Sequence, residues 1–132
     1  MSQENVAVVR RMTEALDRAN WAAVFAEISP DFEWETDPRH PKAGVYRGRD
    51  EFRQFMEDLE EPFEQTVTEF EKLFASADQV VAFVKIRRRL EGSGVEIEIR
   101  IGELYTFRDG TLVRGQAFAQ REKALDAAGL SE

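Results

Sequence analysis

Residues 80–118 read VVAFVKIRRRLEGSGVEIEIRIGELYTFRDGTLVRGQAF, and this stretch decides the fold. Apolar and polar residues alternate along Val80–Leu90, Val95–Phe107 and Leu112–Phe118, a pattern typical of β-strands. Gly92-Ser93 predicts a two-residue hairpin loop between the first two runs, and Asp109-Gly110, a strong hairpin signal, joins the second run to the third. The stretch therefore predicts an antiparallel meander.

Outside this meander, apolar residues recur mainly at helical spacing, with Asn20 and Asp50 placed to cap two of the helices. We expect helices over residues 2–16, 21–28, 50–61 and 120–128, and a short strand over 32–36. Asp37–Gly48 is predicted to be a loop, whereas Val67–Phe74 fits more than one kind of element. This order predicts a single α+β domain over residues 1–132, with helices on one face of the sheet.

The composition excludes several classes of function. Lys and Arg number 18 against 26 Asp and Glu, so the net charge of −8 argues against nucleic-acid binding. The absence of Cys and the single His exclude disulfides, thiol nucleophiles and thiolate or His-rich metal sites. No nucleotide-binding or nucleophile motif occurs, so we expect neither cofactor nor metal. No apolar run is long enough for a signal peptide or a membrane span, which favours a cytoplasmic protein without a membrane partner.

Glu103 breaks the apolar pattern of the central strand. Two-residue loops fix the register, which predicts Ala82 opposite Glu103 on one side and Gln116 opposite it on the other. The same register pairs Tyr105 with Arg114, and places Phe118 opposite Ile101 on this face. Glu103 is therefore either an ion-paired or hydrogen-bonded core residue, with Arg114 or Gln116 as partner, or the floor of a pocket in which small Ala82 leaves room.

The opposite face of the meander is too apolar at one end to be left in water. Val81 is expected to face Leu104, and Phe83 to face Gly102. Two coverings are open: a second subunit, which gives a homodimer through this outer sheet face, or the C-terminal helix.

Three motifs carry a resemblance to a known family. They are Asp31-Phe32-Glu33-Trp34, Gly44-Val45-Tyr46-Arg47-Gly48-Arg49-Asp50, and Tyr105-Thr106-Phe107-Arg108-Asp109-Gly110-Thr111-Leu112-Val113-Arg114. With the order of elements, they resemble the nuclear transport factor 2-like superfamily, in its SnoaL-like and ketosteroid-isomerase-like branch. The resemblance implies a cone-shaped fold, in which three N-terminal helices and a strongly curved antiparallel sheet enclose an apolar cavity. Its members include isomerases, polyketide cyclases, dehydratases, epoxide hydrolases and non-catalytic binding modules.

The resemblance also implies roles for three positions. Asp37, followed by Pro38, matches the proton-shuttling base of the steroid isomerases, and Glu103 matches their hydrogen-bond-donating acid. Met12 stands where those enzymes carry a Tyr, so half of the expected oxyanion hole is missing. Asp-Pro is also a common start of a turn, and whether Asp37 faces the cavity stays open.

Three further residues are candidate ligand contacts. Trp34 is expected in the core or the cavity wall. Tyr46 would either hydrogen-bond across the cavity mouth or pack its loop against the third helix. His40 lies in the loop that would rim the cavity, as an acid or base or simply as a solvated side chain.

These features lead to three hypotheses. The first is a cofactor-free isomerase or cyclase, in which Asp37 and Glu103 act on a small apolar carbonyl compound. The second is a non-catalytic module that binds a small ligand or a partner, favoured by Met12. The third and weaker one is an epoxide hydrolase or dehydratase, for which Arg114 with Glu103 and Asp37 is the nearest constellation.

Overall fold

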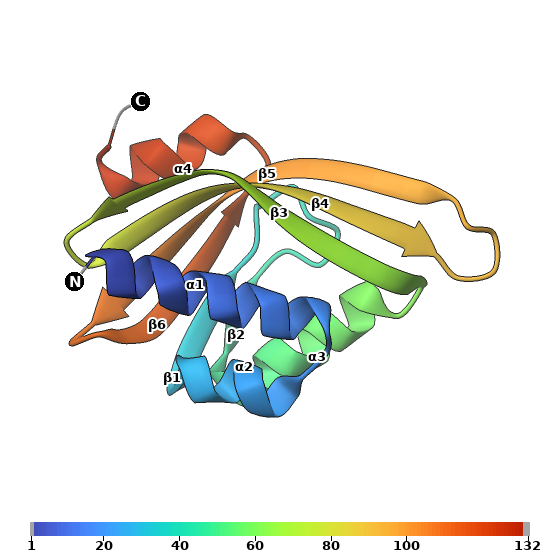
Figure 1. Cartoon of the computed structure of the whole chain (residues 1–132), viewed down its shortest axis with the longest axis horizontal. Helices are drawn as coiled ribbons and strands as arrows, with labels where there is room; N and C mark the ends of the chain where they lie inside the picture. Colours follow the sequence, from blue (N-terminus) through green and yellow to red (C-terminus); the bar gives the residue numbers. More distant parts are fainter. Residues whose placement is uncertain (1, 131–132) are drawn as a thin grey trace.

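The computed structural model describes residues 2–130, so the extreme ends of the predicted 1–132 domain lie outside the described residues. The elements are α1 (Ser2–Asp17), α2 (Trp21–Glu27), β1 (Ile28–Glu35), β2 (Val45–Arg47), α3 (Gly48–Glu60), β3 (Phe63–Ser76), β4 (Gln79–Leu90), β5 (Glu96–Arg108), β6 (Thr111–Phe118) and α4 (Arg121–Ala128). Figure 1 shows α1, α2 and α3 on one face of the curved sheet and α4 on the other. The predicted α+β class is confirmed, but the expectation of helices on one face only is wrong, because α4 packs on the other face.

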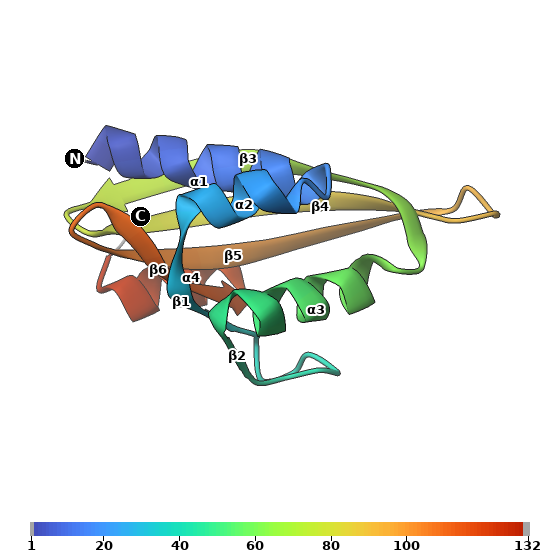
Figure 2. The same cartoon turned by 90° about the horizontal axis from the view of Figure 1, so that it is seen from below.

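The six strands form one sheet in the order β2-β1-β6-β5-β4-β3. Strands β3 to β6 pair antiparallel and include the predicted meander, and β2 pairs antiparallel with β1. The sheet is mixed rather than wholly antiparallel, because β1 pairs with β6 in parallel. Strand β2 lies inside the segment predicted as a loop, and the undecided Val67–Phe74 lies within β3. The long β4–β5 hairpin projects beyond the helices (Figure 2).

Helix ends follow local hydrogen bonds; one predicted cap is present and the other is not. Asn20 caps α2 as predicted, since its side chain accepts from the Ala23 amide at 3.2 Å. Helix α3 begins at Gly48, ahead of Asp50, and Glu51 instead accepts from the backbone amide of Arg47 at 2.9 Å. None of the described helices is long and apolar enough to cross a membrane.

The register of the first hairpin is confirmed. Ala82 lies opposite Glu103, and Arg88 lies opposite Ile97. The turn keeps the predicted pairing of Leu90, whose amide donates to the Val95 carbonyl at 2.8 Å. Glu103 therefore lies on the face of the sheet that packs against α1 and α3.

The predicted register of the second hairpin is wrong beyond its first pairs. Phe107 pairs with Leu112 as expected, but Thr106 then pairs with Arg114, so one extra residue, Val113, enters β6 as a β-bulge. Glu103 consequently lies opposite Ala117 instead of Gln116. The pairs predicted for Tyr105 with Arg114 and for Ile101 with Phe118 are also absent, and Arg114, Gln116 and Phe118 lie on the opposite face.

Gly115 gives the physical reason for this shift. It pairs with Trp34 across the parallel β1–β6 contact, and a Cβ atom added there would lie 2.6 Å from the indole ring. The bulge brings this glycine under the indole, where no larger residue fits, and Trp34 can then lie buried against the sheet.

Two apolar clusters lie on the two faces of the sheet. The larger cluster fills the space between the sheet and the first three helices. The smaller cluster contains Val81, Phe83 and Leu104 from the outer face and Ala124 and Leu125 from α4. The C-terminal helix thus covers the apolar end of the outer face, one of the two predicted alternatives. A homodimer through this face stays a prediction, which sedimentation equilibrium would test.

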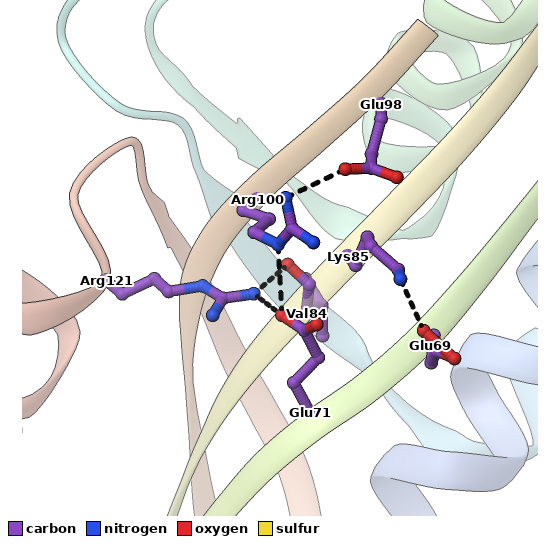
Figure 3. A network of polar contacts seen from close by, with 7 residues as sticks. All are labelled: Glu69, Glu71, Val84, Lys85, Glu98, Arg100 and Arg121. Atoms are coloured by element: carbon purple, nitrogen blue, oxygen red, sulfur yellow. Dashed lines mark hydrogen bonds and ion pairs between the residues drawn. The ribbon is translucent and has the colours of Figure 1, made fainter. Parts of the chain in front are cut away.

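A polar network fastens the beginning of α4 to the sheet (Figure 3). Arg121 donates to the Val84 carbonyl at 2.9 Å and pairs with Glu71, which also pairs with Arg100 at 3.4 Å. The Arg121 guanidinium lies 5.3 Å from the centre of the Phe83 ring. These contacts join α4 to three neighbouring strands and hold it over the outer cluster.

Candidate functional site

A pocket of about 340 Å³ lies between the concave face of the sheet and helices α1 and α3. Its walls are mainly apolar and include Trp34, Phe52, Phe55, Leu59, Ile86 and Ile101. The polar groups that line it include Thr13, Asp17, Asp37, His40, Glu103 and Tyr105. Such a pocket fits a small apolar ligand that carries few polar groups.

Glu103 is the buried acid of this pocket, with 8% of its surface exposed. The Tyr105 hydroxyl donates to its Oε1 at 2.8 Å. Burial raises the pKa of Glu103 to about 7, the Tyr105 hydrogen bond opposes this rise, and Asp17 adds to it. The carboxyl group is therefore close to half ionised at neutral pH, where it can both accept and return a proton.

Tyr105 stays a neutral phenol beside this carboxyl group. Its side chain is almost fully buried, and burial together with the Glu103 charge raises the Tyr105 pKa well above its ordinary value. Its ring centre lies 6.2 Å from that of Trp34. Tyr105 thus acts as a fixed hydrogen-bond donor to Glu103.

The end of the pocket near α1 holds a polar cluster that the sequence analysis missed. Arg88, with 9% of its side chain exposed, binds the Glu60 carboxylate at 2.8 Å. Asp17 accepts from the Thr68 amide at 2.7 Å and from its hydroxyl at 2.9 Å. Burial raises the pKa of Asp17. Arg88 shares the alternation phase of Ile86 and Ala82, so the strand pattern already contained a signal for its inward direction.

Asp37 lies at the edge of the pocket, but hydrogen bonds already occupy its carboxylate. One oxygen accepts from the Ala119 amide at 2.7 Å, and the other accepts from the Arg39 amide at 2.9 Å. These amides, Ala119 foremost, lower the pKa of Asp37. Asp37 therefore ties its loop to the residue after β6, and its lowered pKa makes it a weak proton acceptor.

The other candidates from the loop serve mainly to pack it. His40 lines the pocket, and its Nδ1 accepts from the Lys42 amide at 2.9 Å. Tyr46 donates to the Lys42 carbonyl at 2.6 Å, and its ring centre lies 4.3 Å from that of Phe55 in α3. Tyr46 therefore packs the loop against the third helix, the second of the two roles considered for it. Trp34 forms part of the pocket wall.

The remaining five predicted contacts fall into three groups. Met12 and Ala82 are fully buried in the main core and are absent from the pocket lining. Arg114 and Gln116 do not converge on Glu103, because the bulge in β6 turns them to the opposite face, where Arg114 pairs with Glu35. Phe118 borders the pocket, while its half-buried side chain packs against the outer cluster.

No group of three or more His, Asp or Glu side chains in residues 2–130 is arranged to hold a metal ion. The polar groups that line the pocket are carboxyl, hydroxyl, imidazole and guanidinium groups in a mainly apolar enclosure.

A curved sheet backed by three helices, with a pocket between them, defines the nuclear transport factor 2-like class of α+β domain. The sequence profile of the SnoaL-like domain matches residues 9–115, and the chain belongs to this family. The resemblance inferred from the three motifs is thereby confirmed. No curated protein matches the chain.

Solved structures agree on the fold. A nuclear transport factor 2-like protein of unknown function from Burkholderia pseudomallei has a TM-score of 0.77 at 18% identity, covering 93% of this chain and 95% of that chain. A putative SnoaL-like polyketide cyclase from Jannaschia sp. has a TM-score of 0.73 at 19% identity, over 89% and 85%. A hypothetical protein with a ketosteroid isomerase-like fold from Catenulispora acidiphila, in complex with trimethylamine, has a TM-score of 0.72 at 15% identity, over 94% and 93%.

Proposed function

We propose that the protein is a cofactor-free enzyme of the isomerase or cyclase type that acts on a small apolar carbonyl compound. The observation that carries this proposal is the Glu103–Tyr105 pair, a buried acid with a pKa of about 7 inside an apolar pocket. Membership in the SnoaL-like family, which includes polyketide cyclases and isomerases, supports the same class of reaction.

Glu103 is the proton-transferring group in this proposal. Its carboxylate takes a proton from the carbon next to the carbonyl, and the electron pair of the C–H bond moves toward the carbonyl oxygen. The protonated carboxyl group then gives a proton, either the one it took or one exchanged with solvent, to a different carbon, so one proton is removed and one is returned. Trp34, Phe52 and the other apolar walls hold the substrate and exclude water from the intermediate.

Asp37 is the competing base, because it matches the steroid-isomerase base in the sequence. Its two amide contacts and lowered pKa favour a structural role. The non-catalytic hypothesis keeps the support of Met12, which leaves the predicted tyrosine position without a hydroxyl. The epoxide hydrolase or dehydratase hypothesis loses Arg114, which pairs with Glu35.

Exchange of carbon-bound hydrogen tests this proposal without knowledge of the natural substrate. We expect the protein to accelerate deuterium incorporation next to the carbonyl of 2-tetralone in D₂O, followed by NMR. Glu103→Gln should slow the exchange at least about 100-fold, because a positioned acid or base usually accelerates a reaction by that factor or more. Glu91→Gln, in the exposed β4–β5 turn, is the matched control and should leave the rate unchanged.

The outcomes separate the three assignments. Loss of exchange in Asp37→Asn, with normal exchange in Glu103→Gln, would move the base to Asp37. Tight binding of ketones without any exchange in the wild-type protein would favour the binding module and contradict the enzyme.

A further inference from the structure

Thr13 carries an unpaired hydroxyl beside the pocket. The residue lies in the middle of α1, has 7% of its surface exposed, and is part of the pocket lining. Its Oγ1 is buried and has no hydrogen-bond partner among the described residues. A threonine inside a helix can donate to a backbone carbonyl one turn earlier, and Thr13 makes no such bond.

The other buried polar atoms without partners are of a different kind. They are the Nε atoms of Arg49 and Arg121. Each of these guanidinium groups is bound through another nitrogen: Arg49 donates to the Phe25 carbonyl at 2.7 Å, and Arg121 to the Val84 carbonyl. Neither arginine lines the pocket, so within residues 2–130 Thr13 is the one pocket side chain whose buried polar atom is unbound.

The neighbours of Thr13 determine what it can bind. Burial and the Glu103 charge raise the pKa of Tyr105, and an interaction with the Thr13 side chain opposes this rise, so the Thr13 hydroxyl lies near the proposed reaction centre. This contact does not have the geometry of a hydrogen bond, which leaves the Thr13 hydroxyl available to a ligand. The Tyr105 proton is already donated to Glu103, and the Asp17 oxygens accept from Thr68. A ligand oxygen that needs a donor at this end of the pocket can therefore obtain it from Thr13.

We propose that Thr13 donates a hydrogen bond to the carbonyl oxygen of the ligand and so selects oxygen-bearing compounds over hydrocarbons of equal shape. An unbound buried hydroxyl costs stability in the free protein, whereas a valine of the same shape would not. The ligand oxygen would supply the missing partner. This inference rests on the pocket being the carbonyl-binding site of the proposed function, but it requires no turnover.

A pair of matched probes tests it. The dissociation constants of 2-acetylnaphthalene and 2-ethylnaphthalene, which differ mainly in the carbonyl oxygen, would be measured by NMR titration. We expect the ratio of the two constants to change about 10-fold in Thr13→Val toward the hydrocarbon. Thr13→Ser, which keeps the hydroxyl, should preserve the wild-type ratio. The ligand-free Thr13→Val protein should melt roughly 2–5 °C higher than wild type, since it loses an unbound hydroxyl.

Each contrary result has a distinct meaning. An unchanged ratio in Thr13→Val would overturn the role of Thr13, while the exchange assay with Glu103→Gln could still uphold the proposed function. A lower melting temperature in Thr13→Val would show that the hydroxyl supports Tyr105 in the free protein, which also contradicts the inference. Failure of both probes to bind the wild-type protein would show that the pocket does not bind such carbonyl compounds. That result would contradict both this inference and the proposed function.

Discussion

Glu103 places an ionisable group where its neighbours on the strand are apolar, and its titration links the site to stability. The unfolded carboxyl group has a pKa near 4.5, and the folded one has a pKa of about 7. Between these values the folded protein binds more protons than the unfolded chain, so the free energy of unfolding falls as the pH rises. The loss of stability caused by ionising buried Glu103 is absent below pH 4.5 and complete above pH 7.

Glu103→Gln should therefore stabilise the protein at high pH. The difference between the folded and unfolded pKa of Glu103 corresponds to about 3 kcal/mol in the free energy of unfolding at pH 8. The advantage of the variant should shrink toward zero near pH 4.5. Urea unfolding of both proteins across pH 4.5 to 8 measures the difference directly. A variant that is equally or less stable than wild type at pH 8 would show that Glu103 gains more from its charge than burial costs it. Glu91→Gln again serves as the exposed control.

Asp37 should behave in the opposite way. Its pKa is lowered by the Ala119 and Arg39 amides, so its contribution to stability is present above the ordinary carboxyl pKa of 3.8 and is lost as the pH falls through its lower folded value. Asp37→Asn keeps one side-chain oxygen and loses the charge, and we expect it to lower the free energy of unfolding by about 1 kcal/mol at pH 7. Denaturant unfolding checks this. An unchanged stability would argue that the carboxylate is kept for chemistry instead of for the loop.

Strand β6 shows where prediction from local pattern succeeds and where it fails. Asp109-Gly110 correctly predicts the turn, because the turn conformation depends on those two residues. The bulge at Val113 depends on the contact of Gly115 with Trp34 from a strand far away in the sequence, and strand alternation alone does not reveal it. A glycine inside a strand is nevertheless a recognised sign of a bulge or of close packing, and it was the available signal.

Gly115→Ala tests this explanation of the bulge. The added methyl group meets the Trp34 ring at 2.6 Å, and we expect a loss of about 1–3 kcal/mol in the free energy of unfolding. Trp34→Phe has a smaller ring, so the double variant should be less destabilised than the sum of the two single variants. A thermodynamic cycle by urea unfolding measures this coupling. Strict additivity would mean that the indole does not set the register.

The type of element formed by Val67–Phe74, within β3, was left open in the sequence analysis for a related reason. The pairing of β3 with β4 shifts between Phe70 and Lys72, so the inward phase changes partway along the strand. A shift of one residue moves the following side chains to the other face, which blurs the period-two pattern. Strand β2, Val45–Arg47, is too short for any periodicity and exists through its pairing with β1.

At the scale of the whole molecule, the fold was more predictable than the site. The order of helices and strands follows from periodicity and turns, and three motifs identified the family. Glu103 was also found, because a charge among apolar residues is visible in one strand. The polar cluster of Asp17, Glu60 and Arg88 was missed, although strand alternation placed Arg88 on the inner face, because Asp17 and Glu60 look like ordinary surface charges until α1, α3 and β4 come together.

The parallel contact of β1 with β6 has a consequence for how the molecule forms. It joins the first and last strands of this sheet, and the pocket lining includes Ala117 and Ala119, which are made long after β1. The N-terminal helices and β1 therefore emerge from the ribosome long before their neighbour in the sheet exists. Contacts between such distant segments slow folding, because a long loop must close before they give any stability. The edge of β1 that β6 later covers stays open throughout that interval, which leaves the nascent chain prone to aggregation until β6 has been made.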